Sequence, residues 1–197
     1  MPSRAQSLPW TRRAVVVGLL LAGAGPALSG VLIERTLAFA NKKPVLLTDV
    51  TLTRVLLGLD EADALERTID QTLMFEEASR LLNEPFADQA VAEATQALEE
   101  KAGAGFGQAA LRRKARTELA IASYIEARLK PLVRVGDDEV RQLFNERVIR
   151  EPNPPVFSDV AQPIREALEA QSLDQKIEEW VASLRMRAVI RRPPPRR

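Results

Sequence analysis

Two short stretches with the alternating pattern of a β-strand lie at opposite ends of a chain whose remaining length carries helical patterns. Residues 34–50 hold two apolar runs on either side of Asn41-Lys-Lys-Pro44, which predicts a β-hairpin leading into a helix. The other strand candidate is 184–191. Because an isolated strand needs a partner, we expect residues 188–190 to pair with the hairpin and to bring both ends of the domain together.

Apolar residues at helical spacing fill the length between these strands. Helices are expected at about 50–58, 60–82, 86–101, 108–130, 137–144 and 158–184, with breaks at proline or glycine between them. The helix at 108–130 is the longest uninterrupted one, and its basic residues Arg112, Arg113, Lys114 and Arg116 are expected to face solvent. Trp180 is expected in the core. The predicted fold is mostly α, a helical bundle with a small antiparallel sheet.

The residue types that are absent exclude several chemistries. The chain has no cysteine and no histidine, which removes thiol nucleophiles, disulfides, histidine acid/base catalysis and Cys/His zinc sites. Three glycines within 103–107 lack the Lys-Ser/Thr ending of a phosphate loop and predict a flexible joint. The adjacent acids Asp137-Asp138-Glu139 are typical of a charged helix start. We therefore expect no cofactor, no metal and no catalytic residue.

Charge is distributed unevenly along the chain. Residues 34–184 contain 19 Lys/Arg and 27 Asp/Glu, whereas residues 185–197 contain six arginines and no acid. A nucleic-acid-binding domain would carry its basic face in the folded part, so nucleic acid is not an expected partner. The Pro/Arg tail at 192–197 is interpreted as a solvated end, with binding to lipid or lipopolysaccharide phosphates as the alternative.

The N-terminus has the features of an export signal. Residues 1–29 contain three arginines, an apolar run at 14–22 and small residues before a cut at Gly30, which predicts a signal peptide. Residues 14–33 are also an uncharged run of 20 residues, long enough for a retained membrane anchor and the membrane association it would bring. Residues 30–191 would form a single helical domain. In both cases we expect this domain in the periplasm, free or anchored to the inner membrane.

Several short motifs follow one another in the order found in a known family. The motif residues are Ala38-Phe-Ala-Asn41, Val45-Leu-Leu-Thr-Asp-Val50, Ala64-Leu65 through Ile69-Asp70, Leu73 to Glu77, Tyr124-Ile-Glu-Ala-Arg128, Pro131, Val135 through Val140, Phe144, Phe157-Ser-Asp-Val160, Ile164, Leu168, Trp180, Leu184-Arg185 and Ala188-Val-Ile190. In this order and spacing the chain resembles the non-catalytic part of the SurA-like, parvulin-associated family of exported peptidyl-prolyl isomerases and chaperones. The resemblance implies a SurA N-terminal-like helical bundle that binds peptide.

The chain departs from this family at the position of the catalytic domain. Members with isomerase activity carry a parvulin domain between segments that resemble 137–144 and 157–160. Here the gap is Asn145 to Val156, twelve residues, and there is no histidine or cysteine for a parvulin site. The resemblance therefore implies the fold and the peptide binding without the isomerase chemistry.

These observations predict an exported chaperone-like protein that binds unfolded or extended polypeptide clients, outer-membrane proteins among them. The candidate client contacts are Leu81, Leu82, Phe86 and Phe106, near the joint at 103–107. Plain core packing is the alternative for each of them. A membrane-tethered adaptor that binds one specific partner is the alternative function, and a peptidyl-prolyl isomerase is a third.

Overall fold

The computed structural model describes residues 34–81, 86–148 and 154–194. The expected signal peptide at 1–29, the alternative anchor at 14–33, the candidate residue Leu82 and the last three residues of the tail lie outside the described residues. The account below concerns the described part of the chain.

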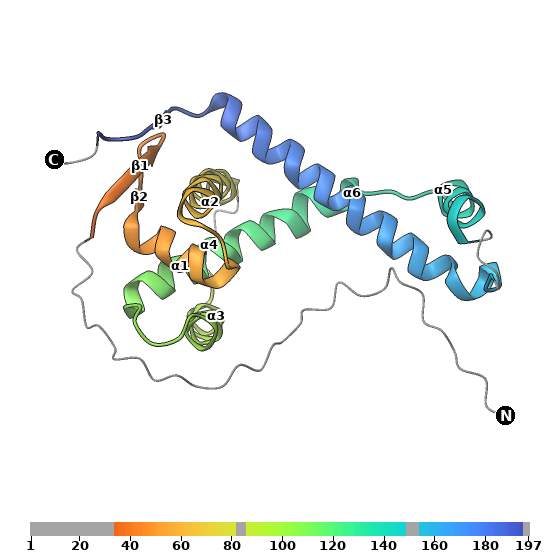
Figure 1. The fold of residues 1–197 in the computed structure, drawn as a ribbon, viewed down its shortest axis with the longest axis horizontal. Coiled ribbons are helices and arrows are strands. Elements are labelled where there is room, and N and C mark those ends of the chain that lie inside the picture. The colour runs from red at the N-terminus through yellow and green to blue at the C-terminus, as the bar shows by residue number, and fades with distance from the viewer. Residues whose placement is uncertain (1–33, 82–85, 149–153, 195–197) are drawn as a thin grey trace. The chain divides into compact units, whose positions relative to one another are not determined.

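A three-stranded antiparallel sheet joins the hairpin to the C-terminal end of the chain (Figure 1). Its strands are β1 (Thr36–Ala40), β2 (Lys43–Leu46) and β3 (Ile190–Arg191), in the spatial order β2-β1-β3. In β3, Ile190 lies opposite Ala40 and Arg191 lies opposite Phe39. The prediction that the two ends pair is confirmed, although the strand begins at Ile190 instead of Ala188.

Asn41, in the turn between β1 and β2, connects three parts of the fold. Its φ of 55° lies in the left-handed region, which asparagine tolerates better than most residues. Its backbone N–H donates to the carbonyl of Val189 at 2.9 Å, and its side-chain oxygen accepts from the Val189 N–H at 3.0 Å. Its side-chain amide donates to Glu76 at 2.8 Å. One turn residue thus fixes the segment before β3 and the hairpin on the neighbouring helix.

The rest of the described chain is mostly helical. The helices are α1 (Leu47–Leu57), α2 (Glu61–Leu81), α3 (Asp88–Ala102), α4 (Gln108–Tyr124), α5 (Asp137–Leu143) and α6 (Phe157–Arg187), with π-helical turns η1 (Ile125–Leu129) and η3 (Phe144–Val148) and the 3₁₀ turn η2 (Lys130–Leu132). The predicted fold class, mostly α with a small antiparallel sheet, is confirmed.

The predicted starts and lengths of the helices agree in part with those in the structure. Asp60 accepts the backbone N–H of Asp63 at 2.8 Å, which satisfies one unpaired donor in the first turn of α2. The longest helix is α6, with 31 residues, so the prediction for 108–130 is wrong. The regular α-helix there ends at Tyr124, and the chain reaches Pro131 through η1 and η2.

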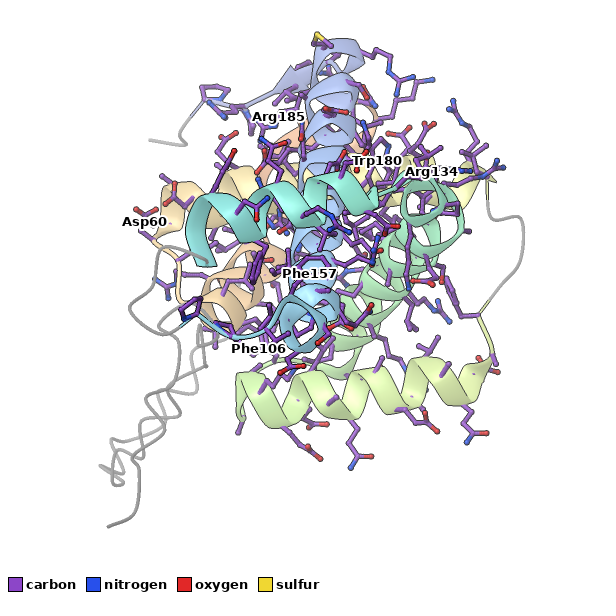
Figure 2. All side chains as sticks on the ribbon, turned by 90° about the vertical axis from the view of Figure 1, so that its right-hand side faces the viewer. Asp60, Phe106, Arg134, Phe157, Trp180 and Arg185 are labelled. Carbon is purple, nitrogen blue, oxygen red and sulfur yellow. The ribbon has the colours of Figure 1, made fainter. Side chains whose placement is uncertain are left out.

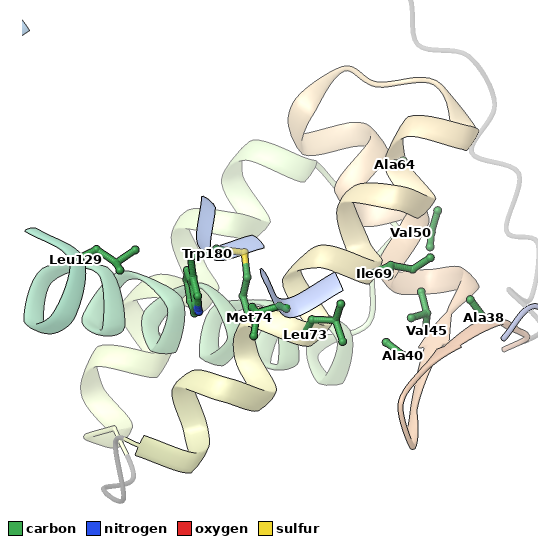
Figure 3. Close-up of a cluster of buried hydrophobic side chains, with 11 residues drawn as sticks. Ala38, Ala40, Val45, Val50, Ala64, Ile69, Leu73, Met74, Leu129 and Trp180 are labelled. Atoms are coloured by element: carbon green, nitrogen blue, oxygen red, sulfur yellow. The ribbon is translucent and has the colours of Figure 1, made fainter. Parts of the chain in front are cut away.

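Buried apolar side chains form three separate clusters. We call them the central core, between the sheet, α2, η1 and α6; the α3–α4 core; and the α5 cluster. The central core contains Ala38, Ala40, Val45, Val50, Ala64, Ile69, Leu73, Met74, Leu129, Trp180 and Leu184 (Figure 3). The α3–α4 core contains Leu52, Leu98, Leu111 and Ala115, and the α5 cluster contains Val140, Phe144 and Ile164. Trp180 lies in the core as predicted and stacks on Tyr124, with ring centroids 4.3 Å apart.

Lys114 is buried, which contradicts the expectation that all four basic residues of this helix face solvent. Its ammonium donates to Thr53 of α1 at 3.1 Å and to Gln71 of α2 at 2.5 Å. The prediction failed because successive helical residues are about 100° apart, so basic residues at 112, 113, 114 and 116 surround the helix. Burial lowers the pKa of Lys114 from its ordinary value.

Candidate functional site

The structure separates the residues that the sequence singled out as client contacts. Leu81 is exposed at the end of α2, and Phe86 is partly buried just before α3. Phe106 follows α3 and packs against the α3–α4 core, at one end of that helix in Figure 2. Phe86 and Phe106 therefore flank opposite ends of a 15-residue helix, which is about 22 Å long. These two side chains do not form one patch.

A groove lies elsewhere, between the segment that follows η1 and the middle of α6. It has a volume of about 390 Å³ and is lined by Lys130, Val133, Glu166, Glu169, Ala170 and Leu173. That volume is at the low end of ligand pockets, which span about 300–1,000 Å³. Val133, Ala170 and Leu173 supply an apolar surface, and the other three side chains supply charge. The groove is open to solvent and of a size to receive one or two side chains of a larger molecule.

The segment along one side of the groove is tied to the body at both ends. Leu129, just before it, is buried in the central core. At the other end Arg165 of α6 donates to the carbonyl of Val135 at 2.9 Å and to the carboxylate of Asp137. Pro131 lies between these two attachments and restricts the backbone of its own residue. The segment that forms this side of the groove is therefore held at both of its ends by contacts within the domain.

Two further apolar side chains outside the groove are exposed, and one of them is next to a lining residue in the chain. Leu132, next to the lining residue Val133, is 61% exposed, and Val156, just before α6, is 67% exposed. Beside Val156, the Phe157 ring meets Phe144 edge to face at 5.2 Å and the Arg141 guanidinium at 5.1 Å. Sequence reasoning missed this region. The available signal was an extended apolar segment, Leu132 to Val135, immediately after a proline that ends a helix.

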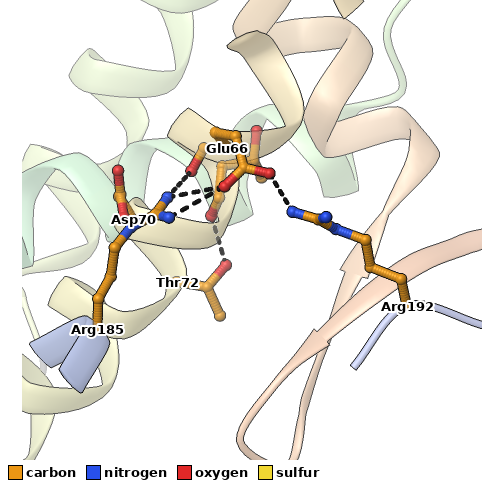
Figure 4. Close-up of polar contacts among 6 residues, drawn as sticks. Glu66, Asp70, Thr72, Arg185 and Arg192 are labelled. Atoms are coloured by element: carbon orange, nitrogen blue, oxygen red, sulfur yellow. Dashed lines mark hydrogen bonds and ion pairs between the residues drawn. The ribbon is translucent and has the colours of Figure 1, made fainter. Parts of the chain in front are cut away.

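Some of the arginines at the C-terminal end form ion pairs with carboxylates of α2. Figure 4 shows Arg185 bonded to the carboxylates of Glu66 and Asp70, and Arg192 bonded to Glu66. The hydrogen bond that the Arg185 guanidinium donates to the Asp70 carboxylate is the main cause that raises the pKa of Arg185. Together with the pairing of β3 and the Asn41–Val189 bonds, these ion pairs form what we call the C-terminal clasp. Two of the six arginines within residues 185–197, one of them in the tail at 192–197, thus already form ion pairs.

The described residues contain no group of three or more His, Cys, Asp or Glu that could hold a metal ion. The carboxylate of Asp137, at the start of α5, pairs with Arg165. Within the same described ranges, no helix combines the length and the apolar composition needed to cross a membrane. The residues that line the groove can bind apolar and charged side chains of another molecule.

Comparison with known proteins gives no relative: no family model matches the chain, and neither the curated proteins nor the solved structures contain a match.

Proposed function

We propose that this protein is an exported, chaperone-like module that binds extended apolar segments of unfolded polypeptides, without isomerase chemistry. The observation that supports the proposal most is the open groove between residues 130–133 and α6. Its apolar surface is formed by Val133, Ala170 and Leu173, and its walls are held by Leu129 and Arg165. A preformed groove with apolar lining lowers the ordering cost of binding a flexible segment.

The size of the groove agrees with weak, side-chain-level binding. A site of about 390 Å³ holds a small part of a client, so affinity would come from several such contacts along an unfolded chain. The exposed Leu132 next to the groove would extend the contact surface. This is the behaviour expected of a holding chaperone, which must release its clients.

The test is suppression of aggregation. The full chain at stoichiometric excess is expected to slow the aggregation of an unfolded outer-membrane protein, measured by light scattering. The substitution Ala170→Phe places a ring in the groove and is expected to abolish most of that effect. The matched control is Ala182→Phe, because Ala182 is also exposed on α6 and lies about 18 Å along the helix from Ala170.

Two results would contradict the proposal. If the unmodified chain does not slow aggregation, the chaperone function is wrong. If both phenylalanine variants keep full activity, the groove is not the binding site. A prolyl-peptide isomerisation assay completes the test, since a rate above background would show chemistry that the proposal excludes.

A further inference from the structure

Two carboxylates on one side of the groove form no ion pair with any of the residues that the structure describes. Glu166 and Glu169 both line it from α6. Among the described residues Glu166 accepts a hydrogen bond from the Gln162 amide at 2.9 Å, and neither carboxylate forms an ion pair. Further along α6, by contrast, Glu179 pairs with Lys176 at 3.0 Å. The acids of the groove are thus not neutralised by the described part of the chain.

Lys130, the one basic residue in the groove lining, already forms an ion pair. The Lys130 ammonium donates to both carboxylate oxygens of Glu126, at 2.8 and 3.0 Å. Lys130 and Glu126 together carry no net charge, so Glu166 and Glu169 leave the lining with a net negative charge. An occupant with a cationic side chain would complement this charge, and an acidic occupant would be repelled.

The spacing of the lining residues matches an extended peptide. Glu169 and Leu173 are four residues apart on α6, which is about 6 Å along the helix axis. Side chains two positions apart on the same face of an extended strand are separated by about 6.6 Å. An apolar side chain resting on Leu173 would therefore place the side chain two positions away beside Glu169.

We infer that the groove selects extended segments in which an apolar residue is followed or preceded, two positions away, by lysine or arginine. This inference rests on the proposed function and names its substrate class. The apolar side chain contacts Val133, Ala170 and Leu173, and the cation meets the carboxylates of Glu166 and Glu169. Clients rich in acidic residues are excluded by the same two carboxylates.

The experiment uses the full chain and three fluorescent peptides of about ten residues, which differ only at one position. The peptides carry Leu-Ser-Arg, Leu-Ser-Gln or Leu-Ser-Glu, and binding is measured by fluorescence anisotropy. The arginine peptide is expected to bind about 1.4- to fivefold more tightly than the glutamine peptide, the range for solvent-exposed ion pairs. The glutamate peptide is expected to bind most weakly. The preference should shrink at high salt because the charges are exposed.

The double substitution Glu166→Gln, Glu169→Gln is expected to remove the preference, so that the arginine, glutamine and glutamate peptides bind the variant with similar affinity. The matched control is Glu178→Gln, Glu179→Gln, which removes two exposed carboxylates of the same helix outside the groove. Retention of the arginine preference in the groove variant would overturn the inference, and so would its loss in the control.

The two proposals fail in distinguishable ways. If the three peptides bind with equal affinity and Ala170→Phe weakens all of them, the proposed function stands and the charge selection is wrong. If none of them binds, the proposed function itself fails. If the chain self-associates and the groove variant does not, the occupant is the arginine-rich end of a second copy, which overturns the assignment to clients.

Discussion

The two halves of α6 pack against different parts of the fold although they belong to one continuous helix. The C-terminal half packs into the central core through Trp180 and Leu184 and continues into the C-terminal clasp. The N-terminal half carries the α5 cluster, where Ile164 is buried together with Val140 and Phe144. One half closes the body of the domain, and the other half supports a small cluster at some distance along the helix (Figure 1).

The difference in buried apolar surface predicts a difference in stability. The central core has eleven buried residues and the α5 cluster has three, so the α5 cluster is expected to open locally before the domain unfolds. The groove lies between the central core and the α5 cluster. Its lining residue Leu173 packs on the central core, and Arg165, earlier on α6, donates to the carbonyl of Val135 and so holds the chain that leads to α5. The predictions below test this comparison.

Trp180→Ala is expected to cause the largest loss, about 3–5 kcal/mol of the free energy of unfolding. The substitution removes a buried ring that stacks on Tyr124, and it leaves a cavity in the central core. Urea denaturation followed by circular dichroism measures the loss. Trp180→Phe is the control, because it keeps an aromatic ring and removes an indole N–H that has no acceptor among the described residues. A similar loss in both variants would contradict the packing explanation.

Ile164→Ala is expected to destabilise the α5 cluster by about 2–5 kcal/mol. Ile164 is 1% exposed and contributes to that cluster alone. Hydrogen exchange should therefore become faster in residues 137–148 and remain unchanged in α2. If exchange becomes faster in α2 to the same extent, the two halves of α6 unfold together and the comparison is wrong.

Arg185→Gln is expected to cost about 1–2 kcal/mol. The guanidinium bonds to Glu66 and Asp70, but its side chain is 34% exposed and water screens part of the attraction. The measurement is the shift of the urea midpoint. The control is Arg187→Gln, since Arg187 is exposed and donates to a carbonyl of its own helix. Equal shifts in the two variants would mean that the ion pairs of Arg185 do not stabilise the clasp.

Val189→Pro is expected to cost about 1 kcal/mol, the value of one hydrogen bond. Val189 lies just before β3 and is not one of its paired positions. Its N–H instead donates to the side chain of Asn41, and the residue is 61% exposed. Val189→Ala keeps this N–H and serves as the control. An unchanged melting temperature in the proline variant would mean that the bond does not stabilise the clasp.

The pH dependence of stability is expected to come from the body and not from the α5 cluster. Burial lowers the pKa of Lys114, which faces Glu118 on α4, Asp49 on α1 and Arg67 on α2. Between this lowered pKa and the unfolded value of about 10.4, the unfolded chain binds more protons than the folded chain. The free energy of unfolding should therefore rise with pH across this window.

Lys114→Met removes this titration, so the difference in urea midpoint between the unmodified chain and the variant should change across the same window. Parallel pH curves for the two proteins would mean that Lys114 titrates normally in the folded state. Hydrogen exchange in 137–148, corrected for its intrinsic pH dependence, should not follow the titration. If it does, the α5 cluster is coupled to the body.

Local chemistry determined a large part of the fold. The hairpin, the extended character of the C-terminal segment, the start of α2 after Asp60 and the burial of Trp180 all follow from short-range signals, namely alternation, turn residues, caps and helical spacing. These signals act between residues that are near in sequence, or they depend on a face that is apolar along its whole length. For this reason the helical fold class could be predicted without coordinates.

Only the tertiary structure decided which residues meet across the fold. Lys114 is buried because α1 and α2 present Thr53 and Gln71 to it, and no pattern within α4 distinguishes it from its basic neighbours. Val133 and Leu173, which are forty positions apart in the chain, both line the groove. The direction of α6 relative to the segment after Pro131 creates this proximity. The relative directions of such segments result from the packing of whole helices against one another. A pattern of residues along the sequence does not contain this information.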